Sequence, residues 1–270
     1  MTDAALSAVG GRPKRAPAPA RRSLMLLYLV SIVAGLGVWH VIASGYSSFV
    51  LAPPTGVLNR LVELTMSGEL PRALGGALQH MALGFLIACA IAIPIGMLMG
   101  RVRLINDLLD PIVNLVYAVP SVAWAPFIMI WFGLFFEARV ALVVMMCTFD
   151  MIIVTSAGAQ NADRKLLNVG RSFGASGWQR FRYILLPESL PFLFTALRIG
   201  AVRAVNAMIT AELFLAAVNL GQIMKQAAVR LDSAAVLGVL AVLCMIGLAL
   251  QEILLLIERR ICVWRQGASS

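Results

Sequence analysis

The chain has 270 residues, of which 60% are apolar and only 13% are charged, and its formal net charge is +9. Apolar runs as long as those in this sequence exclude an ordinary soluble domain, and the composition is that of an integral membrane protein. The positive charge could indicate nucleic-acid binding, but the basic residues lie in separate segments between the apolar runs, which argues against a nucleic-acid partner.

About six runs are long and apolar enough to cross a bilayer, because roughly 20 helical residues span its hydrocarbon core. They extend approximately over Leu24 to Ala43, Ala77 to Gly100, Pro111 to Phe135, Val140 to Ala157, Leu190 to Phe214 and Ala234 to Ile257. The sequence therefore predicts an all-α integral membrane fold with a transmembrane domain at residues 23–258. Residues 1–22 lack apolar periodicity and predict a disordered basic tail, and residues 259–270 form a second tail.

Basic residues are distributed very unequally between the two sides of the predicted spans. If the spans alternate, one side holds Arg12, Lys14, Arg15, Arg21, Arg22, Arg101, Arg103, Arg164, Lys165, Arg171, Arg180, Arg182, Arg259, Arg260 and Arg265. The other side holds only Arg60, Arg72, Arg139, Lys225 and Arg230. The positive-inside rule therefore predicts that both termini, and the loop after the fourth run, are cytoplasmic.

The first three apolar runs each carry one local signal. The first has a basic flank but is too long for the apolar region of a signal peptide, so we expect an uncleaved anchor. After it, Leu51 to Leu70 predicts a turn and a short amphipathic helix on the outer surface. Gly96 and Gly100 form a G-x-x-x-G pair that permits close helix packing. Pro120 and Pro126 each free a backbone carbonyl inside the membrane, which places the third run either near a translocation path or in plain packing.

Four ionisable residues lie within or close to the predicted spans, namely Asp150, Arg198, Arg203 and Glu212. A charge at mid-bilayer is costly, so each should face the bundle interior or reach an interface. We hypothesise that Asp150 and Arg203 pair across adjacent helices, and we assign Arg198 a structural role near the cytoplasmic side. Glu212 remains either part of an outer gate or an interfacial carboxylate.

The stretch from Asp163 to Pro191 is a polar island between apolar runs, and its first half predicts a helix. Leu166, Val169 and Phe173 recur at helical spacing and give that helix a face for contact. Three glycines, Gly170, Gly174 and Gly177, run alongside as a stripe that lets another backbone come close.

The second half of the island predicts another short helix after a break at Gly174. Ser176 and Gln179 have the Ser-x-x-Gln spacing of a capping box. We expect this helix to end at Leu186, because Pro187 lacks a backbone N–H and disfavours the α conformation in its predecessor. Residues 160–190 should therefore form a helix, a tight turn and a helix.

This loop resembles the cytoplasmic loop of permease subunits in bacterial binding-protein-dependent ABC importers, whose pattern is Glu-Ala-Ala, three residues, Gly, nine residues, Ile-x-Leu-Pro. Gly174, Ile184, Leu186 and Pro187 fall in register, whereas Asn168 begins the triplet that replaces Glu-Ala-Ala. The resemblance extends roughly from Leu51 to Ile257, and is to the nitrate, sulfonate and taurine branch. In that branch Pro-x-x-Ala-Trp recurs, here Pro120 to Trp124, and an Ala-Glu-Met position matches Glu212.

The resemblance implies that the loop couples the chain to a separate ATP-binding subunit. The residues implied are Asn168, Gly170, Gly174, Ala175, Trp178, Ile184, Leu186 and Pro187. Asn168 cannot form the ion pair that the family's Glu can make with a basic residue of that subunit. Candidates along the translocation path are Pro120, Trp124, Asp150, Arg203 and Glu212.

The same resemblance implies the partners and the substrate. We expect two ATP-binding subunits, a second permease copy, a periplasmic substrate-binding protein and surrounding membrane lipid, in the bacterial inner membrane and with no cofactor. The implied substrate is a small organic or inorganic anion such as sulfonate, taurine or nitrate, although permeases for pyrimidine vitamin precursors belong to the same branch.

The residues themselves argue against several other functions. Gly170 to Gly174 fits the G-x-S-x-G pattern of serine hydrolases, but no histidine follows His80 to activate the serine. His40 and His80 share no metal-ligand spacing, and interfacial hydrogen bonding is expected for both. No phosphate-binding G-x-x-x-x-G-K-[ST] motif occurs, so ATP hydrolysis must reside elsewhere. The remaining alternative is a secondary transporter or channel without an ATPase partner.

Overall fold

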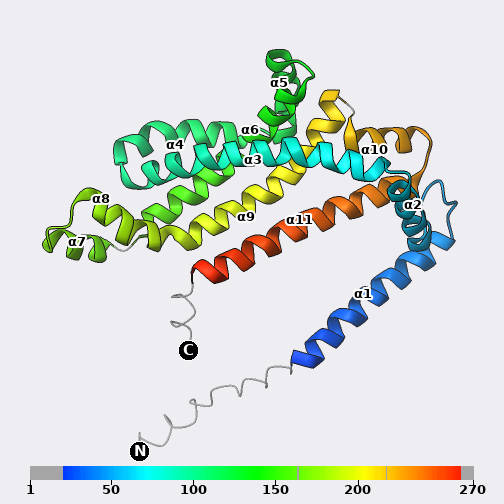
Figure 1. The fold of residues 1–270 in the computed structure, drawn as a ribbon, viewed down its shortest axis with the longest axis horizontal. Coiled ribbons are helices and arrows are strands. Elements are labelled where there is room, and N and C mark those ends of the chain that lie inside the picture. Colours follow the sequence, from blue (N-terminus) through cyan, green and yellow to red (C-terminus); the bar gives the residue numbers. More distant parts are fainter. Residues whose placement is uncertain (1–20, 163, 217, 263–270) are drawn as a thin grey trace, which may run out of the picture. The chain divides into compact units, whose positions relative to one another are not determined.

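The computed structural model describes residues 21–162, 164–216 and 218–262, and these residues are helical or in short connections (Figure 1). The chain divides into two compact units, Met1–Ser47 and Ser48–Ser270. Nearly all of the tail predicted at residues 1–22, and residues 263–270 of the second tail, lie outside the described residues.

The first unit contains one helix, α1 (Arg21–Ser44), in its described part. Its apolar side chains are exposed around the helix, with Leu26 62% and Val41 70% exposed. A helix that is apolar on all sides suits a lipid environment, because no polar face is available for water.

The second unit holds the remaining helices. In chain order they are α2 (Pro54–Met66), α3 (Glu69–Arg101), α4 (Arg103–Ala118), the 3₁₀ turn η1 (Ser121–Ala123), α5 (Trp124–Phe132), α6 (Phe136–Gln160), α7 (Arg164–Ser172), α8 (Gly177–Arg180), the π-helical turn η2 (Phe181–Leu185), α9 (Leu186–Ala211), the π-helical turn η3 (Glu212–Ala216), α10 (Asn219–Val229) and α11 (Ser233–Ile261).

The described residues contain five helices that are long and apolar enough to cross a membrane, and a sixth candidate made of a bent pair. The bent pair is Arg103–Ala118 with Ser121–Phe132, and its two parts meet at 88°. The prediction of about six membrane spans is confirmed if the bent pair is counted as one span. The third span is broken at Pro120, whereas Pro126 lies in the first turn of α5, where a missing N–H costs little.

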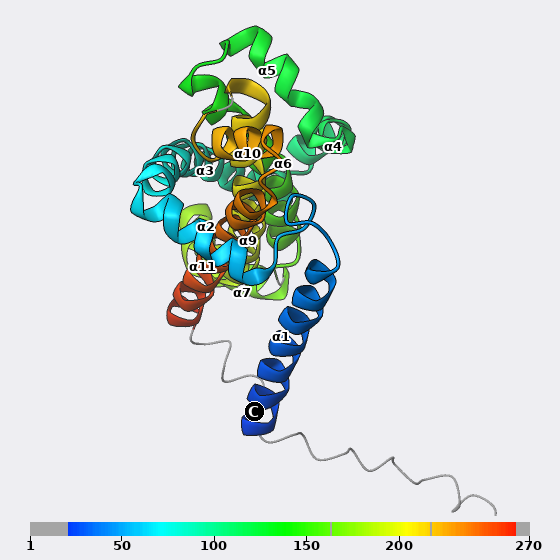
Figure 2. The same ribbon diagram turned by 90° about the vertical axis from the view of Figure 1, so that its right-hand side faces the viewer.

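The core of the second unit is a bundle in which α3 packs on α6 and α6 packs on α9 (Figures 1 and 2). Small residues set the distance between α3 and α6. A Cβ on Gly96 would lie 2.9 Å from the carbonyl oxygen of Ile152, and one on Gly100 would lie 2.6 Å from that of Ser156. The close packing predicted for this G-x-x-x-G pair is confirmed, and its partner is α6.

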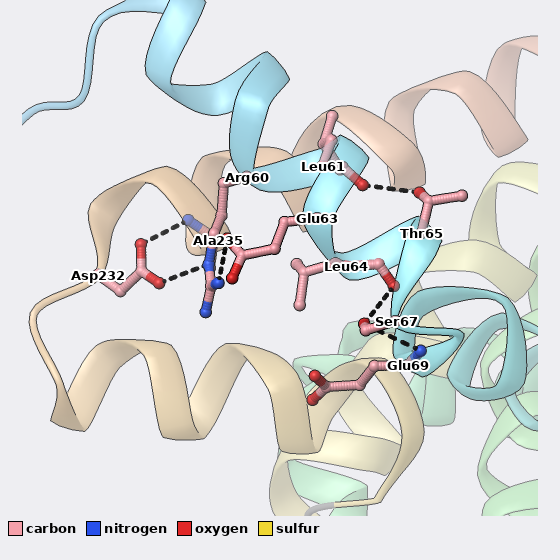
Figure 3. Close-up of polar contacts among 9 residues, drawn as sticks. All are labelled: Arg60, Leu61, Glu63, Leu64, Thr65, Ser67, Glu69, Asp232 and Ala235. Carbon is pink, nitrogen blue, oxygen red and sulfur yellow. Dashed lines mark hydrogen bonds and ion pairs between the residues drawn. The ribbon is translucent and has the colours of Figure 1, made fainter.

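The two ends of the bundle carry different elements. Helices α7 and α8 lie at one end, and α2 and α10 lie at the other (Figure 1). The predicted amphipathic helix after Leu51 is confirmed as α2. Arg60 connects it to the start of α11 (Figure 3), because its Nε donates to Asp232 Oδ2 at 2.9 Å and its Nη1 lies 2.6 Å from Glu63 Oε2. The hydrogen bond with Glu63 raises the pKa of Arg60.

We predict that Gly96→Leu destabilises the bundle by about 1–3 kcal/mol, the usual cost of overpacking a close contact. The matched control is Gly75→Leu on the same helix, since a Cβ at Gly75 meets no atom within 4 Å. Thermal unfolding of the purified proteins in detergent, followed by size-exclusion chromatography, measures the difference. Equal midpoints for the two variants would show that the approach of α3 to α6 does not limit stability.

Candidate coupling loop and membrane cavity

The first helix of the predicted coupling loop, α7, ends in a turn centred on Gly174, whose φ is +73°. The N–H of Gly174 donates to the carbonyl of Arg171, and the N–H of Ala175 donates to the carbonyl of Gly170, both at 3.0 Å. This pair of bonds is a Schellman motif, which satisfies carbonyls left free at a helix end. A Cβ on Gly174 would meet no atom within 4 Å, so space does not explain the glycine. Its left-handed backbone does, because glycine adopts a positive φ at no steric cost.

The second helix of the loop begins with the predicted capping box, which is confirmed. Ser176 Oγ accepts a hydrogen bond from the N–H of Gln179 at 3.2 Å, and Gln179 Oε1 accepts one from the N–H of Ser176 at 2.7 Å. Two N–H groups at the helix start are thereby satisfied. The turn between α7 and α8 is thus held by one cap on each side.

The predicted end of this helix at Leu186 is wrong. The chain stays helical from Gly177 through Pro187 into α9, by way of the π-helical turn η2. In that turn the N–H of Leu186 donates to the carbonyl of Phe181, five residues back. In an α-helix the ring of Pro187 would meet the carbonyl of Tyr183, four residues back; here a π turn precedes the proline and the chain continues as α9.

The predicted glycine stripe is also wrong in part, because Gly174 and Gly177 lie beyond the end of α7 and meet no atom within 4 Å. Gly170 does permit a close contact. A Cβ on it would lie 2.7 Å from Cδ1 of Ile184, so these two predicted loop residues pack against each other.

The large apolar side chains of the loop are exposed within the single chain. They are Leu166 at 44%, Val169 at 51%, Phe173 at 86%, Trp178 at 69% and Tyr183 at 75%. The contact face predicted from Leu166, Val169 and Phe173 is therefore at least partly open within the single chain. Asn168 is exposed as well, whereas Leu186 and Pro187 are half-buried where the loop joins the bundle.

Two anchoring residues of the loop were missed by the sequence analysis. Leu167 and Leu185 are buried, and Leu185 belongs to a small apolar cluster with Met97 of α3 and Ala159 of α6. The signal available was the amphipathic spacing of α7, in which Leu167 occupies the face opposite Val169. This cluster fixes the loop to the C-terminal ends of α3 and α6.

A cavity of about 530 Å³ lies at the break between α4 and α5. It brings together four of the five predicted path residues, Pro120, Trp124, Asp150 and Arg203. Tyr117, Ser121, Met145, Met146 and Phe149 also line it and were missed. The backbone at the 88° break faces this cavity, as expected where non-helical backbone occurs at membrane depth.

Asp150 of α6 and Arg203 of α9 form the predicted ion pair. Arg203 Nε lies 3.0 Å from Asp150 Oδ2, and Arg203 Nη2 donates to Asp150 Oδ1 at 3.3 Å. The two parallel contacts give a bidentate geometry. The Asp150 side chain is 12% exposed and that of Arg203 38% exposed. Arg198, one turn earlier, lies 3.5 Å from Glu258 of α11 and links α9 to that helix.

Glu212 does not line the cavity. It is fully buried at the other end of α9, where Oε1 accepts from Asn219 Nδ2 and Oε2 from the N–H of Gly221, both at 3.0 Å. Its carboxylate is therefore satisfied by α10 and is not exposed on the surface of the chain. Asn219 has a φ of +50°, a left-handed conformation that asparagine tolerates better than most residues.

His80 is a second buried group at this site, and its expected interfacial position is wrong. It is fully buried in α3, with Nδ1 3.1 Å from the carbonyl oxygen of Gly76 and Nε2 3.9 Å from Glu212 Oε1. The proximity of Glu212 could not be read from spacing, because Glu212 is distant from His80 in sequence. Among the described residues no group of histidine, cysteine or carboxylate side chains is arranged to hold a metal.

The chain matches a protein-family model described as a binding-protein-dependent transport system inner membrane component, over residues 92–261. It belongs to this family. The permease is therefore a multi-pass inner-membrane subunit of an ABC importer and is not itself catalytic, and it works with an ATPase and a substrate-binding protein. The alternative of a transporter without an ATPase partner is set aside.

Individual relatives agree with this assignment. The permease is 30% identical over 236 residues to the taurine transport system permease protein TauC of Escherichia coli, covering 85% of this chain and 86% of TauC. It is 30% identical over 240 residues to the riboflavin transport system permease protein RibX of Chloroflexus aurantiacus, covering 89% of this chain and 88% of RibX. A chain of the MetNI methionine ABC transporter in an inward-facing conformation shares the fold, with a TM-score of 0.64 and 21% identity over 73% of this chain and 98% of that chain.

We predict that Asp150→Ala destabilises the permease, because it leaves Arg203 inside the membrane without its carboxylate. The loss should lie below the roughly 3–5 kcal/mol found when a fully buried pair is broken, since Arg203 is 38% exposed. The double variant Asp150→Ala, Arg203→Met should recover much of the loss by removing both charges. Thermal unfolding of the wild type, the two single variants and the double variant gives the coupling energy, and a value of zero would show that the pair is not stabilising.

Proposed function

We propose that the permease imports a small anion and receives the energy for this movement through the loop at residues 160–190. The observation that supports a docking role is the set of exposed apolar side chains at one end of the bundle, on a turn fixed by caps on both sides. Side chains such as Phe173 and Trp178 are costly to leave in water, so a protein partner is expected to cover them. The ATP-binding subunit is that partner in this proposal.

The proposed orientation places both termini and the coupling loop in the cytoplasm. Arg101 and Arg103 lie at the end of the bundle that carries α7 and α8 (Figure 1), as do Arg171 and Arg180. Basic residues concentrate on the cytoplasmic side of membrane proteins. The other end carries α2 and α10 and would face the substrate-binding protein.

Two copies of the permease would enclose the path, with one ATP-binding subunit on each loop. Arg203 supports this arrangement, because its side chain is 38% exposed in the single chain although it lies well inside α9. A guanidinium exposed to lipid at this depth is costly, whereas a water-filled path between two copies would solvate it. The cavity lined by Pro120, Trp124, Asp150 and Arg203 would then open onto that path.

The proposed substrate is a small anion such as a sulfonate, taurine or nitrate. Arg203 is the one cation lining the cavity among the described residues, and its planar guanidinium suits oxyanions. Asp150 holds the guanidinium of Arg203 in place. Its carboxylate would repel an anionic substrate, so the substrate would have to replace Asp150 as the partner of Arg203. The names of TauC and RibX show that relatives at similar identity serve chemically different solutes, so the anion proposal depends on Arg203.

The coupling role is tested by comparing Gly174→Val with Gly174→Asn. Valine in the left-handed conformation costs about 1–2 kcal/mol, whereas asparagine tolerates it. Because a Cβ at this position would meet no atom within 4 Å, both variants should insert and fold. We expect Gly174→Val to reduce ATP-driven uptake about tenfold and to weaken recovery of the ATP-binding subunit with the permease, while Gly174→Asn stays near wild type. Normal uptake by Gly174→Val would exclude the loop as the coupling element.

The substrate class is tested with the assembled transporter and its binding protein in vesicles. We expect ATP-dependent uptake of labelled taurine, nitrate or a short alkanesulfonate, reduced by Arg203→Gln more than by Arg198→Gln. Arg198→Gln is a matched control, because it removes the same charge from α9 at a position outside the cavity. Uptake of only a neutral solute such as riboflavin, or equal effects of the two variants, would overturn the anion proposal.

A further inference from the structure

A second polar pocket lies at the end of the bundle that carries the coupling loop. Its volume is about 950 Å³, and four arginines line it. Arg101 ends α3, Arg103 begins α4, Arg171 lies in the last turn of α7, and Arg180 ends α8. Four separate elements therefore direct positive charge toward one space.

Acidic side chains are few among the described residues that line this pocket. Among its lining residues in the described part of the chain, Asp107 is the one acid, and it lies 3.7 Å from Arg103 with both side chains largely exposed. The Nε atom of Arg180 is buried without a hydrogen-bond partner among the described residues. Asn168 also lines the pocket, and being an amide it adds hydrogen-bonding capacity but no negative charge. The pocket thus fits an oxyanion.

An apolar groove of about 590 Å³ adjoins the pocket. One wall is the last part of α3, with Ile93, Pro94, Met97 and Leu98, and the other is formed by Phe181, Leu185 and Leu186. Arg101, Leu167 and Arg180 line both spaces, so the groove and the pocket are continuous. Because Met97 and Leu98 lie one turn before the end of a membrane-spanning helix, the groove faces acyl-chain depth and the pocket faces headgroup depth.

We propose that this continuous site binds one anionic phospholipid, with its phosphate among Arg101, Arg103, Arg171 and Arg180 and an acyl chain in the groove along α3. An anionic lipid has a phosphate at headgroup depth, where the pocket lies, and an acyl chain at the depth of the groove. The bound lipid bridges the spans, through α3 and α4, to the loop, through α7 and α8. It therefore stabilises the position of the coupling loop against the bundle.

The proposal is independent of the transported substrate and of which side of the membrane is cytoplasmic, since it requires only that the site lie at a membrane surface. Its failure would leave the coupling and anion proposals untouched. Their failure, in turn, would not remove the site.

The direct test is lipid retention by the complete transporter, measured by native mass spectrometry after exchange into detergent with phosphatidylglycerol or phosphatidylcholine. We expect the wild type to retain phosphatidylglycerol selectively. Arg103→Gln with Arg171→Gln should weaken retention about 25-fold, because each basic residue near an anionic lipid contributes about fivefold. The control is Arg259→Gln with Arg260→Gln in the last turn of α11, which removes equal charge outside the site.

A third variant distinguishes an effect on lipid binding from an effect on assembly with the ATP-binding subunit. Asn106→Glu places a carboxylate in the pocket from α4, outside the coupling loop, and should also weaken phosphatidylglycerol retention, while recovery of the ATP-binding subunit stays at the wild-type level. Three results would overturn the proposal. They are equal retention of both lipids, competition by millimolar inorganic phosphate, which would indicate a soluble-anion site, and loss of lipid when the ATP-binding subunit assembles, which would assign the arginines to that subunit.

Discussion

The close approach of α3 to α6 is the constraint on which the rest of the structure depends. Inside a membrane, helices gain little from burying apolar surface, so they associate where small residues let backbones come near enough for dispersion contacts. Gly84, Gly96 and Gly100 of α3 provide this along the length of α6. Because α6 also packs on α9, Asp150 and Arg203 are carried to within 3.0 Å of each other. A larger residue at any of these glycines would displace the helix that holds the aspartate.

Several ionisable groups of the bundle are matched to a partner on another element. Glu212 is satisfied by α10, Asp150 by Arg203, and Arg198 by Glu258. Low dielectric makes each of these contacts strong and each broken one expensive. The pairs therefore specify which helices neighbour α9, while the glycine contacts specify how near they come. The guanidinium of Arg203 differs from the other groups because it remains partly exposed beside a cavity.

The coupling loop and the cavity are joined by continuous helix. From Gly177 to Leu215 the chain forms one membrane-span candidate of 39 residues, and Arg203 lies on it. The π-helical turn at Phe181–Leu185 keeps this connection helical despite Pro187. A displacement of α8 would therefore be transmitted along α9 without a flexible joint between them. The basic pocket beside α7 and α8 adds a place where the membrane itself could influence that displacement.

Local features of this protein could be predicted from the sequence because they depend on neighbours within a few residues. Apolar runs predicted the spans, Ser176 and Gln179 predicted a cap, Pro120 predicted a break, and the Gly-to-Pro spacing of the loop predicted the family. Features that depend on distant residues could not be derived in the same way. Leu185, just before Pro187, packs with Met97 of α3 and Ala159 of α6, and the buried carboxylate of Glu212 accepts hydrogen bonds from α10 and lies 3.9 Å from His80 of α3.

The ion pair between Asp150 and Arg203 shows how far prediction from the sequence extends. Sequence reasoning could propose that Asp150 and Arg203 meet, since two opposite charges in apolar helices need partners. It could not place Pro120 and Trp124 beside them, because that depends on the 88° bend of the third span. What the sequence alone determined is therefore which segments enter the membrane and which loop leaves it. Tertiary structure decided which polar groups share a cavity, because helix packing brings together residues separated by more than fifty positions.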